Sequence, residues 1–482
     1  MNVRAILHAL SIMLLILGIA IVACFGLSFL LGDPPEARSA LAVSAVVPLV
    51  LGLGLRRLTA RAYELSRREG MLVVSVGWLI TCAFGALPYV LSGAVRSPVA
   101  ALFESVSGFT TTGASVIADV ESLPRGILLW RSVTHFLGGM GVLVLCVAIL
   151  PFLGTSGMSL YRAEMAGPSK DRLTPRIKST AKRLWALYAF LCFACAALLR
   201  AGGVNWHESF CHAFGAVATG GFSTRNNGVA GFHSVYVELV LMAFMFLGAT
   251  SFTLHLRALR GEVTAWFRDA EWRFFVGFWL LGALLVFLNT WPSQPVPMGQ
   301  SLRDCFFSTL SAVSTTGFGT ADFAQWPVAS RIILMLLMIV GGCTGSTAGA
   351  VKQLRALVLC KLIGAEIRRF VQPQVVVATR AGRTVIGEST AHAMVLFVAL
   401  YALTVVAASL AMSFFVADGE VAISSVIATL GGVGPGLADV GPLGNYMAIP
   451  DGGKGVLILC MLLGRLEFIT FLALALPSFW RK

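Results

Sequence analysis

Charged side chains are scarce in this chain of 482 residues: they make up 12% of it, against 57% hydrophobic residues, and the mean hydropathy is +0.84. Soluble domains contain about 25% charged residues, so this composition argues against an ordinary soluble enzyme. Enzyme signatures are also missing, because the sequence has no HExxH, GxSxG or P-loop motif and its seven histidines are scattered. The composition indicates an integral membrane protein, and we expect no enzymatic activity.

The sequence also lacks the patterns of a metal site and of a voltage sensor. Most of the ten cysteines lie inside apolar runs, and the CxxC pair Cys192 and Cys195 has only apolar neighbours. A zinc site needs further ligands and polar partners, so we expect no bound cofactor. No apolar run carries arginine at every third position, which argues against a voltage sensor.

Ten apolar stretches are long enough to cross a hydrocarbon core of about 30 Å. They are residues 6–32, 40–55, 71–93, 125–151, 183–201, 232–254, 271–289, 329–363, 390–416 and 453–477. The first stretch also resembles a signal peptide, with Arg4 as its basic region and a lipoprotein-like sequence before Cys24. The apolar run continues through Leu31, which favours a retained spanning helix.

The basic residues indicate the orientation of these spans. Ten spans put both termini on one side, together with the linkers 56–70, 152–182, 255–270 and 364–389, which with the termini hold most of the 36 Lys and Arg residues. By the positive-inside rule this side is the cytoplasm. The opposite side carries acidic residues that would attract cations to an external mouth. These are Asp33, Glu36, Glu104, Asp119, Glu121, Glu208, Asp304, Asp322, Asp418, Glu420, Asp439 and Asp451.

Four linkers on the external side share an internal repeat. Each begins with a short apolar stretch, at about 98–109, 206–217, 302–313 and 420–429, and then breaks at glycine. Aligning Gly113, Gly220, Gly317 and Gly434 gives a common pattern that recurs at intervals of roughly 100 residues. The candidate ion-binding residues are Thr111, Thr112, Gly113, Ala218, Thr219, Gly220, Thr315, Thr316, Gly317, Gly432, Val433 and Gly434.

This pattern favours an ion pore. The short stretches suit re-entrant helices, whose C-terminal ends present partial negative charge to a cation. Extended backbone at membrane depth is tolerated only where it is buried in protein or lines a water-filled path. Four such segments around an axis would supply rings of carbonyl oxygens in place of a cation's hydration shell, with glycine allowing the left-handed backbone. The alternative is that the glycines merely form turns in external loops.

Two further features lie within apolar spans. The candidate gate, Gly341, Gly342, Cys343, Thr344, Gly345, Ser346, Thr347, Ala348 and Gly349, interrupts the eighth span, where each glycine costs a helix about 1 kcal/mol. We expect a broken helix there, although small residues for close helix packing are an alternative. Arg465 and Glu467 interrupt the last span, and a mid-membrane arginine marks an ion pathway or a salt bridge between helices.

Across nearly its whole length the sequence resembles the TrkH/TrkG branch of the Trk/Ktr/HKT superfamily of potassium transporters. The most specific matches are Ser107-Gly108-Phe109-Thr110-Thr111-Thr112-Gly113-Ala114, Ser314-Thr315-Thr316-Gly317-Phe318-Gly319, the segment from Gly341 to Gly349, and Gly464-Arg465-Leu466-Glu467. The family resemblance implies that the segment 341–349 is a flexible intramembrane gating loop under the filter, and we place Arg465 with it.

The resemblance also implies an all-α polytopic membrane fold, with two N-terminal helices followed by four pseudo-symmetric repeats of span, pore helix and span around one ion pore. We divide the chain into an N-terminal extension (1–70) and repeats at 71–182, 183–270, 271–389 and 390–482. The third repeat contains the broken eighth span.

The function that the resemblance implies is K⁺ uptake across a bacterial inner membrane, with K⁺ as the transported ion. It further implies a homodimer and a cytosolic regulatory ring of TrkA type that binds nucleotides, since this chain has no nucleotide-binding motif of its own. A sodium- or proton-coupled transporter of another solute, built with broken helices, is the alternative. Such transporters usually have two inverted halves, whereas the repeats found here share one orientation.

Overall fold

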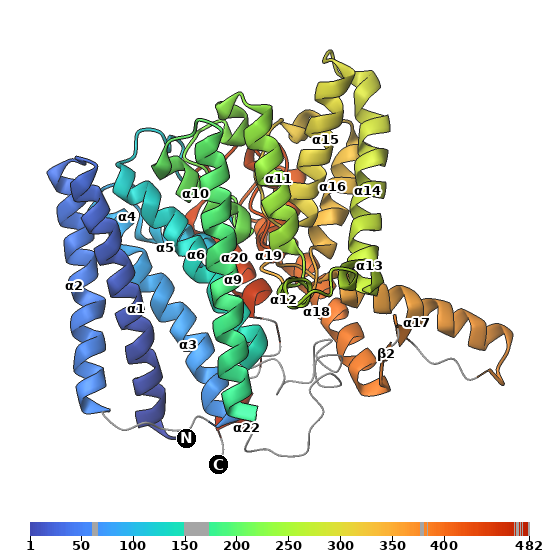
Figure 1. The fold of residues 1–482 in the computed structure, drawn as a ribbon, viewed down its shortest axis with the longest axis horizontal. Coiled ribbons are helices and arrows are strands. Elements are labelled where there is room, and N and C mark those ends of the chain that lie inside the picture. Colours follow the sequence, from blue (N-terminus) through green and yellow to red (C-terminus); the bar gives the residue numbers. More distant parts are fainter. Residues whose placement is uncertain are drawn as a thin grey trace.

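The structure is a computed structural model that describes residues 1–59, 66–148, 173–375, 380–382, 384–466, 468, 472, 474 and 476–480. The described chain is almost entirely helical (Figure 1). Its one strand pairing is a short antiparallel hairpin of β1 (Arg380–Ala381) and β2 (Thr384–Val385). These elements confirm the all-α prediction.

The N-terminal extension is a pair of long helices, α1 (Val3–Leu30) and α2 (Pro35–Leu58), that lie side by side at one edge of the molecule (Figure 1). The side chain of Asn2 caps α1 by accepting a hydrogen bond from the Ala5 amide at 3.3 Å. Asp33, in the turn between the two helices, accepts hydrogen bonds from the amides of Arg125 and Gly126 and so fastens this pair to the first repeat.

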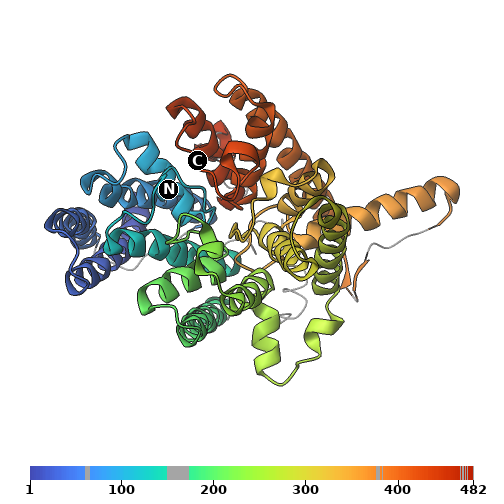
Figure 2. The same ribbon diagram turned by 90° about the horizontal axis from the view of Figure 1, so that it is seen from above.

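Four similar groups of helices follow in chain order. The first contains α3 (Arg67–Gly85), α4 (Leu87–Leu91), α5 (Pro98–Phe109) and α6 (Arg125–Ala148). The second contains α9 (Leu173–Ala201), α10 (Trp206–Val217), η2 (Gly228–Phe232), α11 (Val235–Ala249), α12 (Phe252–Leu259) and α13 (Ala265–Arg268). The third contains α14 (Ala270–Thr290), η3 (Trp291–Ser293), α15 (Met298–Val313), η4 (Phe323–Gln325), α16 (Val328–Val340) and α17 (Gln353–Val371). The fourth contains α18 (Glu388–Met412), α19 (Gly419–Gly431), η5 (Ala438–Val440), α20 (Asp451–Leu466) and α22 (Pro477–Trp480). Seen from above, the groups succeed one another around a common centre (Figure 2).

Seven of the ten predicted spans have a counterpart among the described helices that are long and apolar enough to cross a membrane; the spans predicted at 125–151, 329–363 and 453–477 do not. By length and composition, six described helices can cross a membrane, or seven if α11 and α12, which are bent by 99° at Thr250 and Ser251, count as one. The eighth predicted span is broken, because α16 ends at Val340 and α17 begins at Gln353. The ends of the predicted spans at 149–151 and part of 467–477 lie outside the described residues.

Four shorter helices, α5, α10, α15 and α19, lie between the spans of their groups. At 12 to 16 residues they are about 18–24 Å long, too short to cross the hydrocarbon core. Side chains of Ser97, Asn205 and Asp418 cap the starts of three of them by accepting amide hydrogen bonds. Two large apolar clusters enclose these helices, one mostly from the first and fourth groups and the other mostly from the second and third.

Candidate functional site: four backbone loops around one axis

The four short helices end in loops with the same backbone conformation. The first left-handed residue after each helix is Thr111 (φ 52°), Thr219 (φ 54°), Thr315 (φ 55°) or Gly432 (φ 70°). Two residues later each loop has a left-handed glycine: Gly113 (φ 81°), Gly221 (φ 77°), Gly317 (φ 84°) or Gly434 (φ 94°). A non-glycine residue in this region costs roughly 1–2 kcal/mol, so the recurrence in four separate loops indicates a shared structural demand.

The second loop differs by one residue from the alignment made on sequence. The structural counterpart of Gly113 is Gly221, not Gly220. Backbone hydrogen bonds give the same register, since the residue before each left-handed glycine donates to the carbonyl five positions earlier: Thr112 to Ser107 (2.9 Å), Gly220 to Gly215 (2.8 Å), Thr316 to Ser311 (2.9 Å) and Val433 to Ala428 (2.8 Å). The sequence alignment was one residue off here because two glycines follow Thr219. The sequence alone does not show which of the two adopts the left-handed conformation.

The left-handed glycines close the four loops into a ring. Each lies against the carbonyl oxygen of the next loop: Gly113 against Gly220, Gly221 against Thr316, Gly317 against Val433, and Gly434 against Thr112. The series returns to its starting point, as expected for four loops that surround one axis. A Cβ atom at any of the four glycines would overlap the facing carbonyl, so only glycine fits.

Several threonine hydroxyls in these loops have partners within the protein. In the first and third loops the hydroxyls of Thr112 and Thr316 bond to the hydroxyl two residues earlier, each at 2.7 Å. The Thr219 hydroxyl donates to the carbonyl of Ala218 at 2.7 Å. The Thr315 hydroxyl accepts a hydrogen bond from the amide of Gly349 at 2.8 Å, which joins the third loop to the interruption between α16 and α17.

That interruption, residues 341–352, lies at the inner end of the four short helices. Thr347 donates its hydroxyl to the carbonyls of Val217 (2.9 Å) and Gly248 (3.0 Å), at the ends of α10 and α11. On the other side, the α-carbon of Gly349 lies against the carbonyl of Gly431, the last residue of α19. The segment therefore touches parts of three repeats directly below the ring of loops.

A carboxylate that sequence reasoning missed holds the start of this segment. Glu271, near the beginning of α14, accepts hydrogen bonds from the amides of Thr344 and Leu354. Its place at the first residue of the apolar run 271–289 is the one sequence signal, and it is a weak one because Arg268, Asp269 and Arg273 lie beside it.

Arg465, on α20, is buried with an exposed fraction of 7% and contacts the same segment. Its guanidinium donates to the carbonyl of Thr347 at 2.9 Å and, more weakly, to that of Gly138 at 3.4 Å. Glu467, which sequence analysis named beside it, lies outside the described residues.

The position that Arg465 occupies in the fourth repeat carries a different residue in the repeats compared here. Gly464 lies against the carbonyl of Leu430 at the end of α19, just as Gly138 lies against Phe109 and Gly248 against Val217. The next residues, Gly139 and Ala249, are small where the fourth repeat has arginine. One of several equivalent positions thus carries a buried positive charge.

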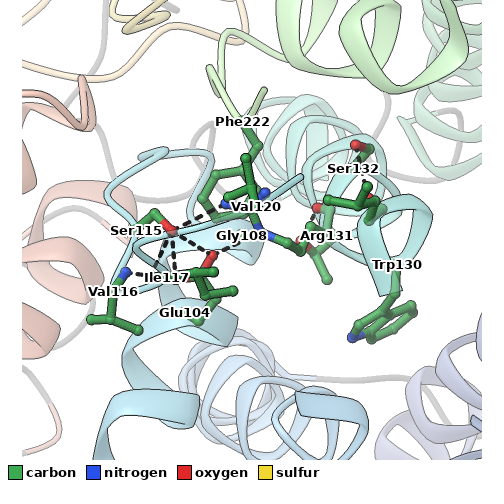
Figure 3. Close-up of polar contacts among 12 residues, drawn as sticks. Glu104, Gly108, Ser115, Val116, Ile117, Val120, Trp130, Arg131, Ser132 and Phe222 are labelled. Atoms are coloured by element: carbon green, nitrogen blue, oxygen red, sulfur yellow. Dashed lines mark hydrogen bonds and ion pairs between the residues drawn. The ribbon is translucent and has the colours of Figure 1, made fainter. Parts of the chain in front are cut away.

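A buried ion pair between Glu104 and Arg131 lies beside the ring of loops. The sequence analysis did not predict that these two residues pair. Arg131 Nε lies 2.8 Å from a carboxylate oxygen of Glu104, and the two side chains are 2% and 0% exposed. Glu104 also accepts hydrogen bonds from the Ser115 hydroxyl and the Val116 amide, both after the first loop (Figure 3).

The same arginine reaches the second loop. Arg131 donates to the carbonyl of Ser223 at 3.2 Å. Its guanidinium lies 4.1 Å from the centre of the Phe222 ring, and both residues are labelled in Figure 3. The ion pair therefore joins the first two loops. In the second repeat His212 takes the position of Glu104, seven residues before the first left-handed residue, and bonds to the hydroxyl of Ser223 at 3.1 Å.

The outer mouth above the ring is less acidic than the sequence suggested. The pocket there is lined by residues from all four loops and includes two arginines but no acidic side chain. Several of the acids expected at this mouth have structural partners instead: Glu104 pairs with Arg131, Glu208 with Arg225 at 2.8 Å, and Asp33 binds backbone amides of α6. A hydrogen bond from the Asn226 side chain lowers the pKa of Asp119 in the external loop. Among the described residues, no group of three or more His, Cys, Asp or Glu side chains could hold a metal ion.

Comparison with known proteins agrees with this architecture. The profile of the TrkH family, described as "Cation transport protein", matches residues 39–482. A "Trk system potassium uptake protein TrkH" from Halomonas elongata is 39% identical over the full length of both chains. Escherichia coli proteins named TrkH and TrkG are 38% and 34% identical, each over 87% of both chains. The crystal structure of the potassium transporter TrkH from Vibrio parahaemolyticus superimposes with a TM-score of 0.91 at 33% identity, over the full length of both chains.

Proposed function

The chain belongs to the TrkH family of cation transport proteins, and from that premise we propose that it takes up K⁺ through a selectivity filter formed by its four backbone loops. The protein is a multi-pass membrane ion transporter and not an enzyme. The transported ion is then the only ligand that the mechanism needs.

The observation that carries the proposal is the closed ring of glycines and carbonyls. Gly113, Gly221, Gly317 and Gly434 each lie against a carbonyl of the next loop, so the four backbones surround one narrow axis. Left-handed residues at alternate positions allow successive carbonyls to face the same side, and rings of carbonyl oxygens replace the hydration shell of K⁺. The C-terminal ends of α5, α10, α15 and α19 converge on this place, and their dipoles stabilise a cation there.

The proposed filter residues are those of the sequence analysis, with one adjustment in the second repeat. Gly221 joins Thr219 and Gly220, because it holds the left-handed position that Gly113 holds in the first loop. Ala218 is the last right-handed residue before the loop and supplies its carbonyl at the inner end. Thr111, Thr112, Thr315, Thr316, Gly317, Gly432, Val433 and Gly434 keep their proposed roles.

The segment Gly341 to Gly349 acts as the gate in this account. It lies below the filter, where its hydrogen bonds to Val217 and Thr315 hold it against the inner ends of two loops. Arg465 adds a hydrogen bond to the carbonyl of Thr347 and a positive charge beneath the filter. Flow then requires these few hydrogen bonds to break while the helices around them stay in place.

The membrane orientation and the partners that we propose rest on the charge of the linkers and on the names of the related proteins. The basic linkers favour cytoplasmic termini in a bacterial inner membrane. The related proteins are named as members of a Trk system, which favours a cytosolic TrkA-type partner that binds nucleotides, and we propose that the chain works as a homodimer. We propose the same units but begin the four repeats with α3, α9, α14 and α18, at Arg67, Leu173, Ala270 and Glu388, because boundaries at residues 70, 182, 270 and 389 would cut these helices.

The alternative function, coupled transport of another solute by two inverted halves, receives no support from the loop geometry. Each loop contacts the next in one direction around the axis, which supports four repeats of one orientation. We therefore retain K⁺ uptake as the proposal.

Ion flux into liposomes that contain the purified protein tests the proposal. We expect uptake of K⁺ and Rb⁺ to exceed that of Na⁺, and Gly113→Ala to reduce this preference or abolish uptake, because its Cβ would overlap the carbonyl of Gly220. The matched control is Gly93→Ala, which has a similar φ of 71° but open space around the added Cβ and a place outside the filter. Equal K⁺ and Na⁺ flux in the parent, or a parent-like preference in Gly113→Ala, would contradict the filter assignment.

A further inference from the structure

Tyr446 connects the fourth filter loop to the first from a position outside both. It lies between η5 and α20, and its side chain is 2% exposed. Its hydroxyl donates a hydrogen bond to the carbonyl of Gly434 at 2.6 Å, and its backbone amide donates to the carbonyl of Ser115 at 2.8 Å. Its ring packs against Phe103 on α5, with ring centres 5.4 Å apart.

This hydrogen bond makes the fourth loop unlike the other three. In the part of the chain that the structure describes, the carbonyls of Gly113, Gly221 and Gly317 accept no hydrogen bond, whereas that of Gly434 accepts one from Tyr446. Pro435 follows Gly434 directly, and its ring further restricts the backbone at this point. The outermost ring of the filter therefore has three carbonyls without a protein donor and one that is held.

A hydrogen bond to a carbonyl has two effects on ion binding. It fixes the direction of the C=O group, and it engages a lone pair that would otherwise face the cation. Selectivity in carbonyl filters depends on the number, field strength and mobility of the coordinating oxygens, and each of these changes when one of four carbonyls is tethered.

We propose that Tyr446 is a positioning residue that holds the Gly434 carbonyl and thereby sets the ion preference of the outermost filter ring. This inference rests on the proposed function, because it needs the four loops to be the ion path. Without the hydroxyl, the Gly434 carbonyl is free to turn toward the axis and to follow a smaller ion. The filter then distinguishes K⁺ from Na⁺ less well.

Tyr446→Phe tests the inference because it removes the hydroxyl and keeps the ring against Phe103. The matched control is Tyr236→Phe, since the Tyr236 hydroxyl also donates to a backbone carbonyl, that of Leu198 at 3.1 Å, but between α9 and α11 and away from the filter. We expect the K⁺/Na⁺ flux ratio in liposomes to fall roughly three- to tenfold in Tyr446→Phe, the range that one hydrogen bond permits. The control should keep the parent ratio.

A second variant separates carbonyl positioning from packing. Phe103→Leu disturbs the contact with the Tyr446 ring but leaves the Tyr446 hydroxyl in place. If the hydroxyl sets the ion preference by holding the Gly434 carbonyl, this variant should give less folded protein with an unchanged K⁺/Na⁺ flux ratio. A purely structural role predicts that Phe103→Leu lowers the ratio as much as Tyr446→Phe does. That result would overturn the inference.

The remaining outcomes also decide the question. A parent-like ratio in Tyr446→Phe, or failure of this variant to fold, overturns the role of Tyr446 alone, provided that the parent prefers K⁺. A parent that shows no preference for K⁺ overturns the proposed function together with the inference that rests on it.

Discussion

Replacement of Arg465 should increase K⁺ flux, because in the proposed mechanism this residue opposes ion exit in two ways. Its charge repels a cation that leaves the filter: at a separation of about 6 Å and an effective dielectric constant of about 20, the barrier is roughly 3 kcal/mol. Its hydrogen bond to the carbonyl of Thr347 holds the gating segment, and a hydrogen bond from a charged donor contributes about 1.5–3 kcal/mol.

These magnitudes set the expected effect. A barrier of 3 kcal/mol corresponds to on the order of a hundredfold in rate, and water and counter-charges reduce this figure. We therefore expect Arg465→Gln and Arg465→Ala to raise the maximal K⁺ flux per molecule by roughly tenfold or more. Arg465→Lys keeps the charge and loses only the planar fork of donors, so it should increase flux less.

The assay is Rb⁺ or K⁺ flux into liposomes, normalised to the amount of folded protein in the membrane. Arg257→Gln is the control, because Arg257 is 39% exposed and pairs with Glu262 near the end of α12, away from the pore. If Arg465 instead ties two helices together by a salt bridge, the neutral variants should lose folded protein. Unchanged or reduced flux per folded molecule in both neutral variants would remove Arg465 from the ion path.

Two other perturbations have definite expected results. Deletion within residues 341–349 should raise basal flux and reduce its dependence on the proposed cytosolic partner, since it shortens the segment below the proposed filter. A shortened protein that folds but conducts less than the parent would refute the role of this segment as a gate. Glu104→Gln should lower the midpoint of thermal unfolding, because it leaves Arg131 buried without its partner at a cost of about 3–5 kcal/mol. The double variant with Glu104→Gln and Arg131→Met should recover part of the lost unfolding midpoint. Equal midpoints of the parent and Glu104→Gln would show that the ion pair does not stabilise the fold.

Most of the fold could be read from the sequence because the membrane imposes simple rules. Apolar runs of about 20 residues must form helices, as every backbone group in hydrocarbon needs a partner within the segment. The break in the eighth span was also predictable, since the glycines from Gly341 onward favour no helix. These features depend on local composition alone.

The register of the second loop could not be read in this way. Whether Gly220 or Gly221 adopts the left-handed conformation depends on where α10 ends and on the carbonyl of Thr316 in the next repeat. Both are set by packing between repeats. A sequence with two adjacent glycines is compatible with either register.

The buried charges were misread for a similar reason. Sequence position assigned Glu104 to an acidic external mouth, whereas the fold turns it inward to Arg131, which lies 27 residues further along the chain. The partner of a charge on a re-entrant helix comes from a neighbouring span, so linear proximity does not identify it. An acid and an arginine within apolar segments remain the only sequence signal of such a pair.

The most direct test of the account is to locate the ion. Crystals of the protein grown in Rb⁺ should show anomalous difference density on the axis of the four loops, beside the carbonyl oxygens of Thr112, Gly220, Thr316 and Val433. Replacing Rb⁺ with Na⁺ should remove this density. Well-ordered loops with no Rb⁺ between them, while Rb⁺ occupies another site in the same crystals, would contradict the claim that these loops form the selectivity filter.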